Sequence, residues 1–159
     1  MSEKKVIDKF QPAEDRWEHR AGLEGLRPVL DPFDCRGKNN AFIDMVHKKA
    51  VSRHCYFSGK HRVLDFGCGI GRLTKWLSSL GQYVVGIEIT KEMLDKAKLY
   101  SKSSNVDFIL YDGSNLCFRR ECFDIILSVW VLQHMPNETV TNIIKQMVDC
   151  ILKKDSVYG

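Results

Sequence analysis

The sequence predicts an α/β fold in which a doubly wound parallel sheet is covered by helices on both faces. First, short apolar runs alternate with segments of helical periodicity from residue 40 onward. Second, a glycine-rich turn directly follows the first apolar run, in "RVLDFGCGIGRLTKWL". Third, the candidate functional residues follow the apolar runs, where parallel strands end and where such sheets bind ligands. The 159 residues correspond to about one domain.

Each element is predicted from its residue pattern, in chain order. The predicted strands are residues 61–66, 83–89, 106–111 and 123–132, and the predicted helices are residues 40–55, 72–80, 91–101 and 137–152. Connections between parallel strands are right-handed, and we expect the strand order 3-2-1-4 with a switch point beside the first strand.

Capping residues and apolar spacing predict the helix starts and faces. Asn40, Thr90 and Asn137 stand where three helices should begin, and Gly81 ends another. The residues expected on one face of successive helices are Phe42, Met45, Val46 and Ala50, then Leu73, Trp76, Leu77 and Leu80, then Met93, Leu94, Ala97 and Tyr100, and last Val140, Ile143, Ile144, Met147, Val148 and Ile151. We expect the face of the last helix to point inward.

Residues 1–39 are polar and interrupted by glycines and prolines. This composition predicts an N-terminal lid or a surface wrap that contains a short helix anchored by Trp17. Trp17 and Arg20 either close over a ligand or serve as a surface anchor and a solvated charge. The regular domain is expected over residues 40–159.

The composition is that of an ordinary globular chain with a net charge of +4. The basic residues do not form a stripe, so no nucleic-acid partner is expected. No apolar run approaches the roughly 18 residues that span a bilayer, and no secretory signal is recognisable, so we expect no membrane association and a cytoplasmic location. The six cysteines form no Cys-x-x-Cys pair, which predicts reduced, mostly buried thiols and no metal site.

The glycine turn has the spacing Asp65-x-Gly67-x-Gly69-x-Gly71. A dinucleotide fingerprint counted from Gly67 would need a third glycine where the chain has Arg72. The helix that starts after the turn points its free N–H groups at an anion. Asp65 would repel a pyrophosphate but attract an amino group, so the turn suits a ligand that carries both a carboxylate and an ammonium, as an amino acid does.

At this point "VLDFGCGIGRL" resembles motif I of the class I S-adenosylmethionine-dependent methyltransferases, which have a Rossmann-like sheet. The second strand ends in "GIEIT", whose Glu88 matches the acid that accepts both ribose hydroxyls in that family. The loop "DGSNLCF" is similar to the family's Asp-x-x-x-Leu-Pro-Phe loop, with Cys117 in place of the proline. "FDIILSVWVLQHM" is similar to the family's fourth-strand segment and places His134 at its histidine position.

The resemblance implies S-adenosylmethionine as cofactor and S-adenosylhomocysteine as product. The cofactor-binding residues that it implies are Asp65, Gly67, Cys68, Gly69, Gly71, Glu88, Ile89, Met93, Asp112, Gly113, Ser114 and Trp130. Asp112 would accept from the adenine amino group, and His134 is a candidate base or substrate contact, or else a structural hydrogen-bonding residue. The "VLQHM" form resembles the small-molecule group that includes quinone- and sterol-type methylators, which implies a small-molecule methyl acceptor.

The same resemblance implies a seven-stranded sheet, of which this sequence covers four strands and reaches the turn before the fifth. We therefore expect either a C-terminally shortened fragment or self-association through the exposed edge of the apolar fourth strand.

Two other functions remain open from the sequence. One is a non-catalytic module that binds the cofactor or a partner. The other, which the glycine spacing and Arg72 disfavour, is an NAD-dependent oxidoreductase.

Overall fold

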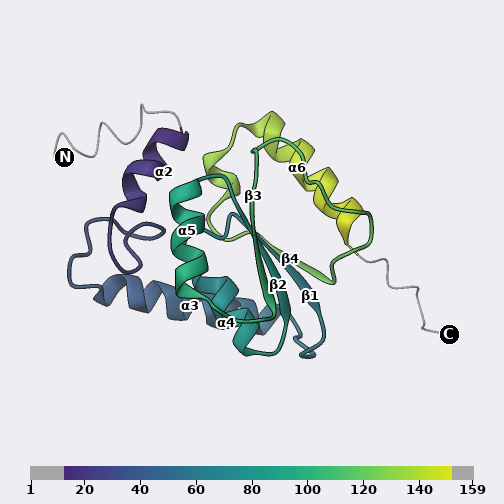
Figure 1. The fold of residues 1–159 in the computed structure, drawn as a ribbon, viewed down its shortest axis with the longest axis horizontal. Helices are drawn as coiled ribbons and strands as arrows, with labels where there is room; N and C mark the ends of the chain where they lie inside the picture. Colours follow the sequence, from purple (N-terminus) through teal and green to yellow (C-terminus); the bar gives the residue numbers. More distant parts are fainter. Residues whose placement is uncertain (1–12, 152–159) are drawn as a thin grey trace.

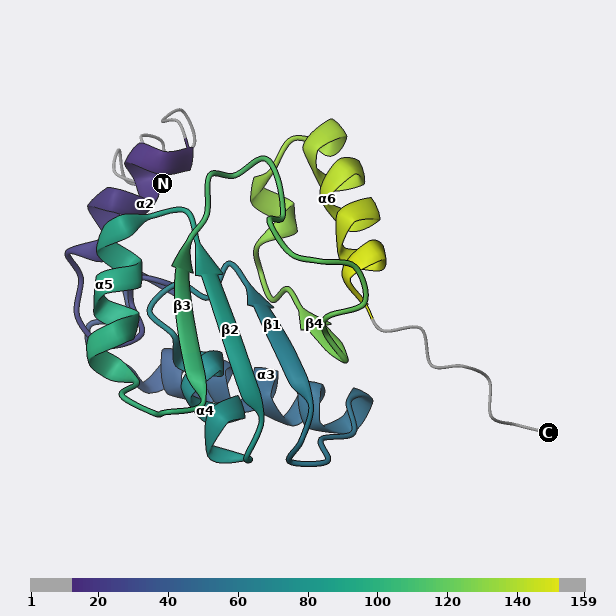
Figure 2. The same ribbon diagram turned by 45° about the vertical axis from the view of Figure 1, so that its right-hand side comes forward.

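The computed structural model describes residues 13–151 and has the predicted α/β architecture (Figure 1). Within these residues the sheet consists of four parallel strands, β1 (Arg62–Phe66), β2 (Tyr83–Glu88), β3 (Val106–Leu110) and β4 (Ile125–Leu127). The strands lie side by side in the order β3-β2-β1-β4, as Figure 2 shows. The predicted fold class and strand order are confirmed.

The helices alternate with the strands along the chain. They are α2 (Ala13–Ala21), α3 (Lys38–His54), α4 (Arg72–Ser79), α5 (Lys91–Tyr100), the short 3-10 helix η1 (Leu132–His134) and α6 (Asn137–Cys150). Each helix predicted from the periodicity is present with boundaries within about two residues, the scatter normal for helix ends.

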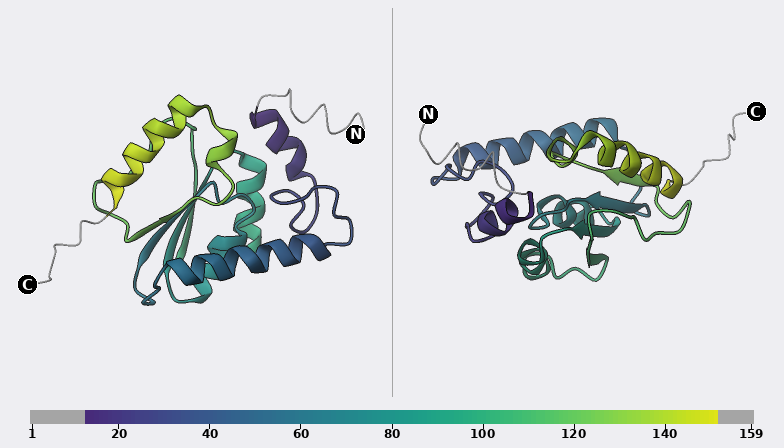
Figure 3. Two further views of the ribbon diagram at one scale, coloured as in Figure 1. Left: turned by 180° about the vertical axis from the view of Figure 1, so that it is seen from behind. Right: turned by 90° about the horizontal axis from the view of Figure 1, so that it is seen from above.

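Different helices cover the two faces of the sheet, because neighbouring residues of a strand point to opposite faces. Val63 of β1 packs in one cluster with Leu77 of α4 and with the end of α3. Leu64, the next residue of β1, packs in another cluster with Ile143 and Met147 of α6. Figures 2 and 3 show α3 and α4 together on one face of the sheet. The carboxyl ends of β1 and β2 are left at one rim.

Helix α3 starts earlier than predicted, and Asn40 is not its N-cap. The N-cap is Gly37, in the left-handed region at φ 70°, and the helix runs from Lys38. Asn40 is 1% exposed. Its side-chain amide exchanges two hydrogen bonds of 2.9 Å with the backbone of Asp31 and so joins the N-terminal segment to α3.

Three of the apolar residues predicted to share one face of α3 are exposed. Phe42 and Met45 are 62% and 54% exposed, and Val46 is exposed too. The side of α3 that faces the protein carries Asp44 and His47, which bind an arginine of α4. Apolar spacing does not mark the side of α3 that meets the protein, because polar contacts as well as packing hold this helix.

The second half of the chain departs from its prediction in two places. Strand β4 ends at Leu127 instead of continuing to residue 132, because the chain turns at Trp130, whose φ of 62° is incompatible with a strand. On α6, Ile143 and Met147 are buried as predicted, but Val148 is 64% exposed. The sheet therefore covers a narrower stripe of α6 than the apolar pattern of this helix indicated.

The predicted caps of the other helices are in place to within one residue, without side-chain capping bonds. Thr90 is the N-cap of α5, and Pro136 stands where Asn137 was expected on α6. All six cysteines are free thiols, as expected, although only Cys68 and Cys150 are fully buried.

The outer edge of β4 is partly covered. Phe123 forms a parallel bridge with Ile151, and the N–H of Phe123 donates to the carbonyl of Cys150. The next N–H, of Asp124, donates to Arg62 on the β1 side. The chain directly after α6 therefore lies beside the edge of β4 that does not pair with β1. Self-association through this edge stays a prediction, and residues 152–159 lie outside the described part.

Candidate functional site

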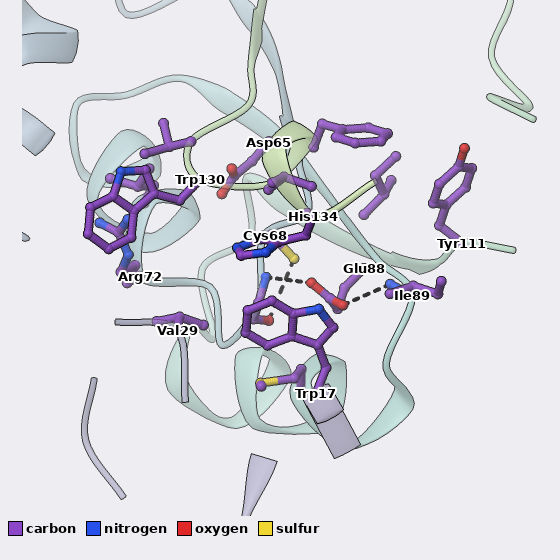
Figure 4. A pocket seen from close by; sticks show the side chains of 18 of the residues that line it. Trp17, Val29, Asp65, Cys68, Arg72, Glu88, Ile89, Tyr111, Trp130 and His134 are labelled. Carbon is purple, nitrogen blue, oxygen red and sulfur yellow. Dashed lines mark hydrogen bonds between the residues drawn. The ribbon is translucent and has the colours of Figure 1, made fainter. Parts of the chain in front are cut away.

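A pocket opens at the carboxyl ends of β1 and β2, at the rim where the glycine turn lies. The space between its walls, which includes open solvent, is about 1000 Å³. Ten of the predicted site residues line it, namely Asp65, Gly67, Cys68, Gly69, Glu88, Ile89, Met93, Gly113, Trp130 and His134. Figure 4 shows how their side chains surround the space.

Gly67 and Gly69 give the turn its shape. Both lie in the left-handed region, at φ 71° and 55°, where glycine is favoured. A Cβ on Gly67 would stand 2.5 Å from Val131 after β4, and a Cβ on Gly69 would overlap Val29 of the N-terminal segment. The glycines therefore allow two other segments that line the pocket to approach the turn closely, whether or not a ligand is bound.

Glu88 ends β2 and binds the turn to the start of α5. Its Oε2 accepts the N–H of Gly69 at 2.9 Å, and its Oε1 accepts those of Ile89 at 2.9 Å and Thr90 at 3.0 Å. Burial raises the pKa of Glu88 above its usual value, and the three N–H groups oppose the rise. A carboxylate offers about four acceptor sites, so it can still take a ligand hydroxyl.

Asp65 is the residue before the last of β1 and lies at the same rim of the pocket. It is 3% exposed, and its Oδ2 accepts the hydroxyl of Thr74 at 2.6 Å. Burial raises the pKa of Asp65, while the bond from Thr74 and the charge of Arg72 lower it. A buried carboxylate at the pocket wall is a site for a cation.

Arg72, the first residue of α4, also lines the pocket, and the sequence interpretation did not assign it a role. It is 6% exposed. Its Nη1 lies 2.9 Å from Oδ1 of Asp44, and its Nη2 lies 2.9 Å from Nδ1 of His47. Arginine only donates, so Nδ1 of His47 is the acceptor and carries no proton. Burial and the charge of Arg72 lower the pKa of His47.

Aromatic side chains close the pocket on two sides. The rings of Trp17 and His134 meet edge to face with centroids 5.1 Å apart, and those of His47 and Trp130 do so at 4.8 Å. In Figure 4, Trp130 and Arg72 lie on one side and Tyr111 on the other. The left-handed φ of Trp130 is a strained conformation for an aromatic residue, of a kind often found at functional sites.

Three predicted site residues do not line the pocket. Gly71 makes room for helix packing, because a Cβ there would stand 3.1 Å from Cβ of Ala97 on α5. Asp112 is exposed, and its Oδ1 accepts the N–H groups of Ser114 at 2.9 Å and Asn115 at 3.2 Å, which lowers the pKa of Asp112. The adenine contacts expected of Asp112 and Ser114 stay predictions.

The sequence interpretation left out several wall residues, including Val29, Tyr111, Val131 and Met135. Val29 and Trp17 come from the segment that was predicted to be a lid or wrap, and Trp17 takes the position over the pocket that was one of two alternatives. These residues reach the pocket only through loop conformation, which leaves no periodic signal. The carboxyl-end position of Tyr111, directly after β3, was a usable signal.

A sheet of this order, with an acid near the ends of β1 and β2 and a glycine turn between them, is a Rossmann-like fold of the kind found in class I S-adenosylmethionine-dependent methyltransferases. A family model described as "Methyltransferase domain" matches residues 63–154. The match covers more than half of the chain, and the chain belongs to this family.

Relatives and solved structures agree with this assignment. The ubiquinone biosynthesis O-methyltransferase of Coxiella burnetii (strain Dugway 5J108-111) is 28% identical over 137 residues, which are 85% of this chain and 53% of that protein. The PH0226 protein of Pyrococcus horikoshii OT3 is 27% identical with a TM-score of 0.62, covering 72% of this chain and 54% of the other. The chain spans about half the length of the curated relatives it matches.

Another solved structure also shares the fold. Phosphoethanolamine N-methyltransferase 1 of Haemonchus contortus, solved with phosphoethanolamine and S-adenosylhomocysteine, matches with a TM-score of 0.76. It covers 96% of this chain and 31% of the other at 14% identity, so it shows the fold alone. None of the helices within residues 13–151 is long and apolar enough to cross a membrane.

Proposed function

We propose that this chain binds S-adenosylmethionine in the pocket at the rim of β1 and β2 and serves in methyl transfer to a small molecule. One observation carries the proposal. Two buried carboxylates, Asp65 and Glu88, and the glycine turn converge on one pocket with largely apolar walls. This set suits a ligand with a polyhydroxylated sugar and a cationic amino-acid tail.

Different residues would bind different parts of this ligand. Glu88 would accept a ribose hydroxyl on the acceptor site that its three backbone N–H bonds leave available. Ile89 would lie against the adenine, on the side of the pocket where Figure 4 also shows Tyr111, and the buried Met93 would contact the adenine too. Asp65 would hold the ammonium of the methionine tail.

S-Adenosylmethionine supplies a methyl group already activated by the sulfonium charge. The work left to the chain is to align the acceptor with the methyl carbon and the sulfur and to keep water out, and orientation of this kind is worth up to about 7–11 kcal/mol. A base is needed only for an acceptor that must lose a proton early. His134 lines the pocket beside Trp17 and is the candidate for that task.

We propose a quinone-like or otherwise aromatic hydroxyl compound as acceptor. The curated relatives are named for ubiquinone biosynthesis and for O-methylation. In this chain the wall after β4 is apolar and aromatic, with Val129, Trp130 and Met135 in the pocket. Such a wall fits a flat, uncharged ring.

Titration calorimetry with S-adenosylhomocysteine and with NAD tests the cofactor proposal. We expect micromolar binding of the sulfur ligand and no heat from NAD, and binding of NAD alone would overturn the assignment. Transfer of labelled methyl to catechol-type phenols then tests the reaction. Tight binding of S-adenosylhomocysteine without transfer to any acceptor, by this chain or by a longer form of it, would favour a non-catalytic cofactor-binding module.

A further inference from the structure

The loop between β3 and β4 is attached to α6 at two places. In Figures 1 and 2 this loop, residues 111–124, runs beside α6. Near the start of the loop, Oε1 of Gln146 accepts the N–H of Leu116 at 2.6 Å, and Nε2 of Gln146 donates to the carbonyl of Ser114 at 3.3 Å. Gly113 of the same loop lines the pocket. Helix α6 therefore holds a loop that forms part of the pocket wall.

The second attachment joins the end of the loop to the last residues of α6. The N–H of Glu121 donates to the carbonyl of Asp149 at 3.0 Å. The N–H groups of Cys122 and Phe123 both donate to the carbonyl of Cys150, at 2.9 and 3.0 Å. Glu121 has a φ of 56°, in the left-handed region that is uncommon for a residue with a side chain. The chain turns at this residue and brings Cys122 beside Cys150.

The two cysteines are close enough to form a disulfide. The backbone nitrogen of Cys122 and the backbone oxygen of Cys150 are 2.9 Å apart. Standard covalent geometry then limits the distance between their Cα atoms to at most about 6.8 Å, and disulfides span Cα separations of about 4.4–6.8 Å. Burial raises the pKa of the Cys150 thiol, and Cys122 raises it further by its charge and by a side-chain hydrogen bond, so the two thiols are neighbours.

The two thiols differ in their access to solvent. Cys150 is 3% exposed and belongs to the core cluster under α6, while Cys122 is partly exposed and packs against that cluster. An oxidant from solvent therefore reaches Cys122 first. Cys150 is then the adjacent thiol that can react with the oxidised sulfur of Cys122.

We propose that Cys122 and Cys150 are a redox site, at which a peroxide forms a disulfide that fixes the end of the loop to α6. The sulfur of Cys122 attacks one oxygen of hydrogen peroxide and breaks the O–O bond, which gives a sulfenic acid and, with the proton of the thiol, one water. The sulfur of Cys150 then displaces hydroxide from the sulfenic acid, and this hydroxide leaves with the proton of Cys150 as a second water. Two thiols and one peroxide thus give one disulfide and two waters, and a dithiol reverses the change.

This site is independent of the proposed function, because neither cysteine lines the pocket. Its effect on the pocket would pass through the loop, which carries Gly113 and is held by the same helix. The disulfide and its effect on stability can therefore be measured without any ligand.

Peptide mapping tests the bond directly. The protein is treated with hydrogen peroxide, the remaining thiols are blocked, and the product is digested with trypsin without reduction. Trypsin cleaves after lysine and arginine, so Cys117, Cys122 and Cys150 fall in separate peptides. In that order the peptides are residues 103–119, 121–145 and 146–153. We expect the second and third peptides to be joined and dithiothreitol to separate them, whereas no bond, or bonds to other cysteines only, would overturn the inference.

The disulfide should also stabilise the fold. It would close the chain between residues 122 and 150, and the constraint on an unfolded chain of this loop length is expected to raise the melting temperature by about 5–15 °C. Oxidised wild type should show this rise relative to the reduced protein, and Cys122→Ser should show none. Serine is similar in size to cysteine and Cys122 is only partly buried, so we expect this variant to fold.

Cys117→Ser is the matched control, because Cys117 is an exposed cysteine of the same loop. After oxidation it should melt like the oxidised wild type. An equal rise in oxidised Cys122→Ser, or a disulfide that forms without raising the melting temperature of the wild type, would contradict the proposal. If Cys122→Ser does not fold, the peptide map of the wild type decides the question by itself.

Discussion

Replacement of Glu88 by glutamine is the most informative single change in the pocket. The amide keeps one oxygen, which can still accept the N–H groups of Ile89 and Thr90. The amide nitrogen then faces the N–H of Gly69, so a donor meets a donor where Oε2 accepts at 2.9 Å in the wild type. The loss of one hydrogen bond to a charged group costs about 1.5–3 kcal/mol.

Two terms of opposite sign act on stability. The lost bond to Gly69 destabilises the fold, while removal of a buried charge stabilises it, because burial raises the pKa of Glu88 and so disfavours its ionised form at neutral pH. We therefore expect the melting temperature of Glu88→Gln to change by only a few degrees, about 1 kcal/mol or less. The ligand has no such compensation, because the two ribose hydroxyls lose one acceptor group.

Calorimetry should accordingly show the affinity for S-adenosylhomocysteine falling by about 10- to 100-fold, which is about 1.4–2.8 kcal/mol. The affinity for 5′-methylthioadenosine should fall by the same factor, since both ligands carry the ribose. Glu92→Gln is the control, because it removes an exposed acid in the first turn of α5. Unchanged affinity in Glu88→Gln would refute the ribose assignment, and a loss confined to S-adenosylhomocysteine would move Glu88 to the tail end.

Three further changes probe the turn and its charges. Gly69→Ala should destabilise the fold by about 1–3 kcal/mol in thermal melts, because alanine is forced into a left-handed φ and its Cβ overlaps Val29. Adding Val29→Ala should recover part of the lost stability. If it recovers none, the cost comes from the backbone conformation alone. The pKa of His47 is lower in the folded than in the unfolded protein, so the stability that His47 contributes is present above about pH 6.5 and is lost as the pH falls through the folded pKa. Thermal melts from pH 7.5 to 5 should show this loss of stability in the wild type and a smaller loss in His47→Asn. Parallel pH curves for the two proteins would contradict the assignment. The pKa of Asp65 is raised in the folded protein, so its carboxylate destabilises the fold as the pH rises above about 3.9. Asp65→Asn should therefore melt at a higher temperature than the wild type at pH 7 but bind S-adenosylhomocysteine at least about tenfold more weakly. Unchanged binding would exclude Asp65 as the site of the ammonium group.

Periodicity determined the sheet and the helices correctly, but it did not show which face of α3 is buried. Phe42, Met45 and Val46 recur at helical spacing, and spacing alone cannot tell which side of a helix meets the protein. The buried side is fixed by Asn40, Asp44 and His47, whose partners come from the N-terminal segment and from α4. Those contacts join residues 9 to 28 positions apart, beyond the reach of any local pattern.

The sequence by itself determined the order of strands and helices and the acids at the tips of β1 and β2, because local spacing places residues at strand ends and parallel strands end at one rim. It indicated the kind of ligand through the charge of Asp65 beside a glycine turn. In the sequence, Arg72 was only a mismatch to the dinucleotide fingerprint. Only the tertiary structure shows that Arg72 is a buried cation held at the pocket wall by residues of α3. The physical reason is that burial and charge balance depend on which distant groups surround a side chain, and packing of the whole chain determines those neighbours.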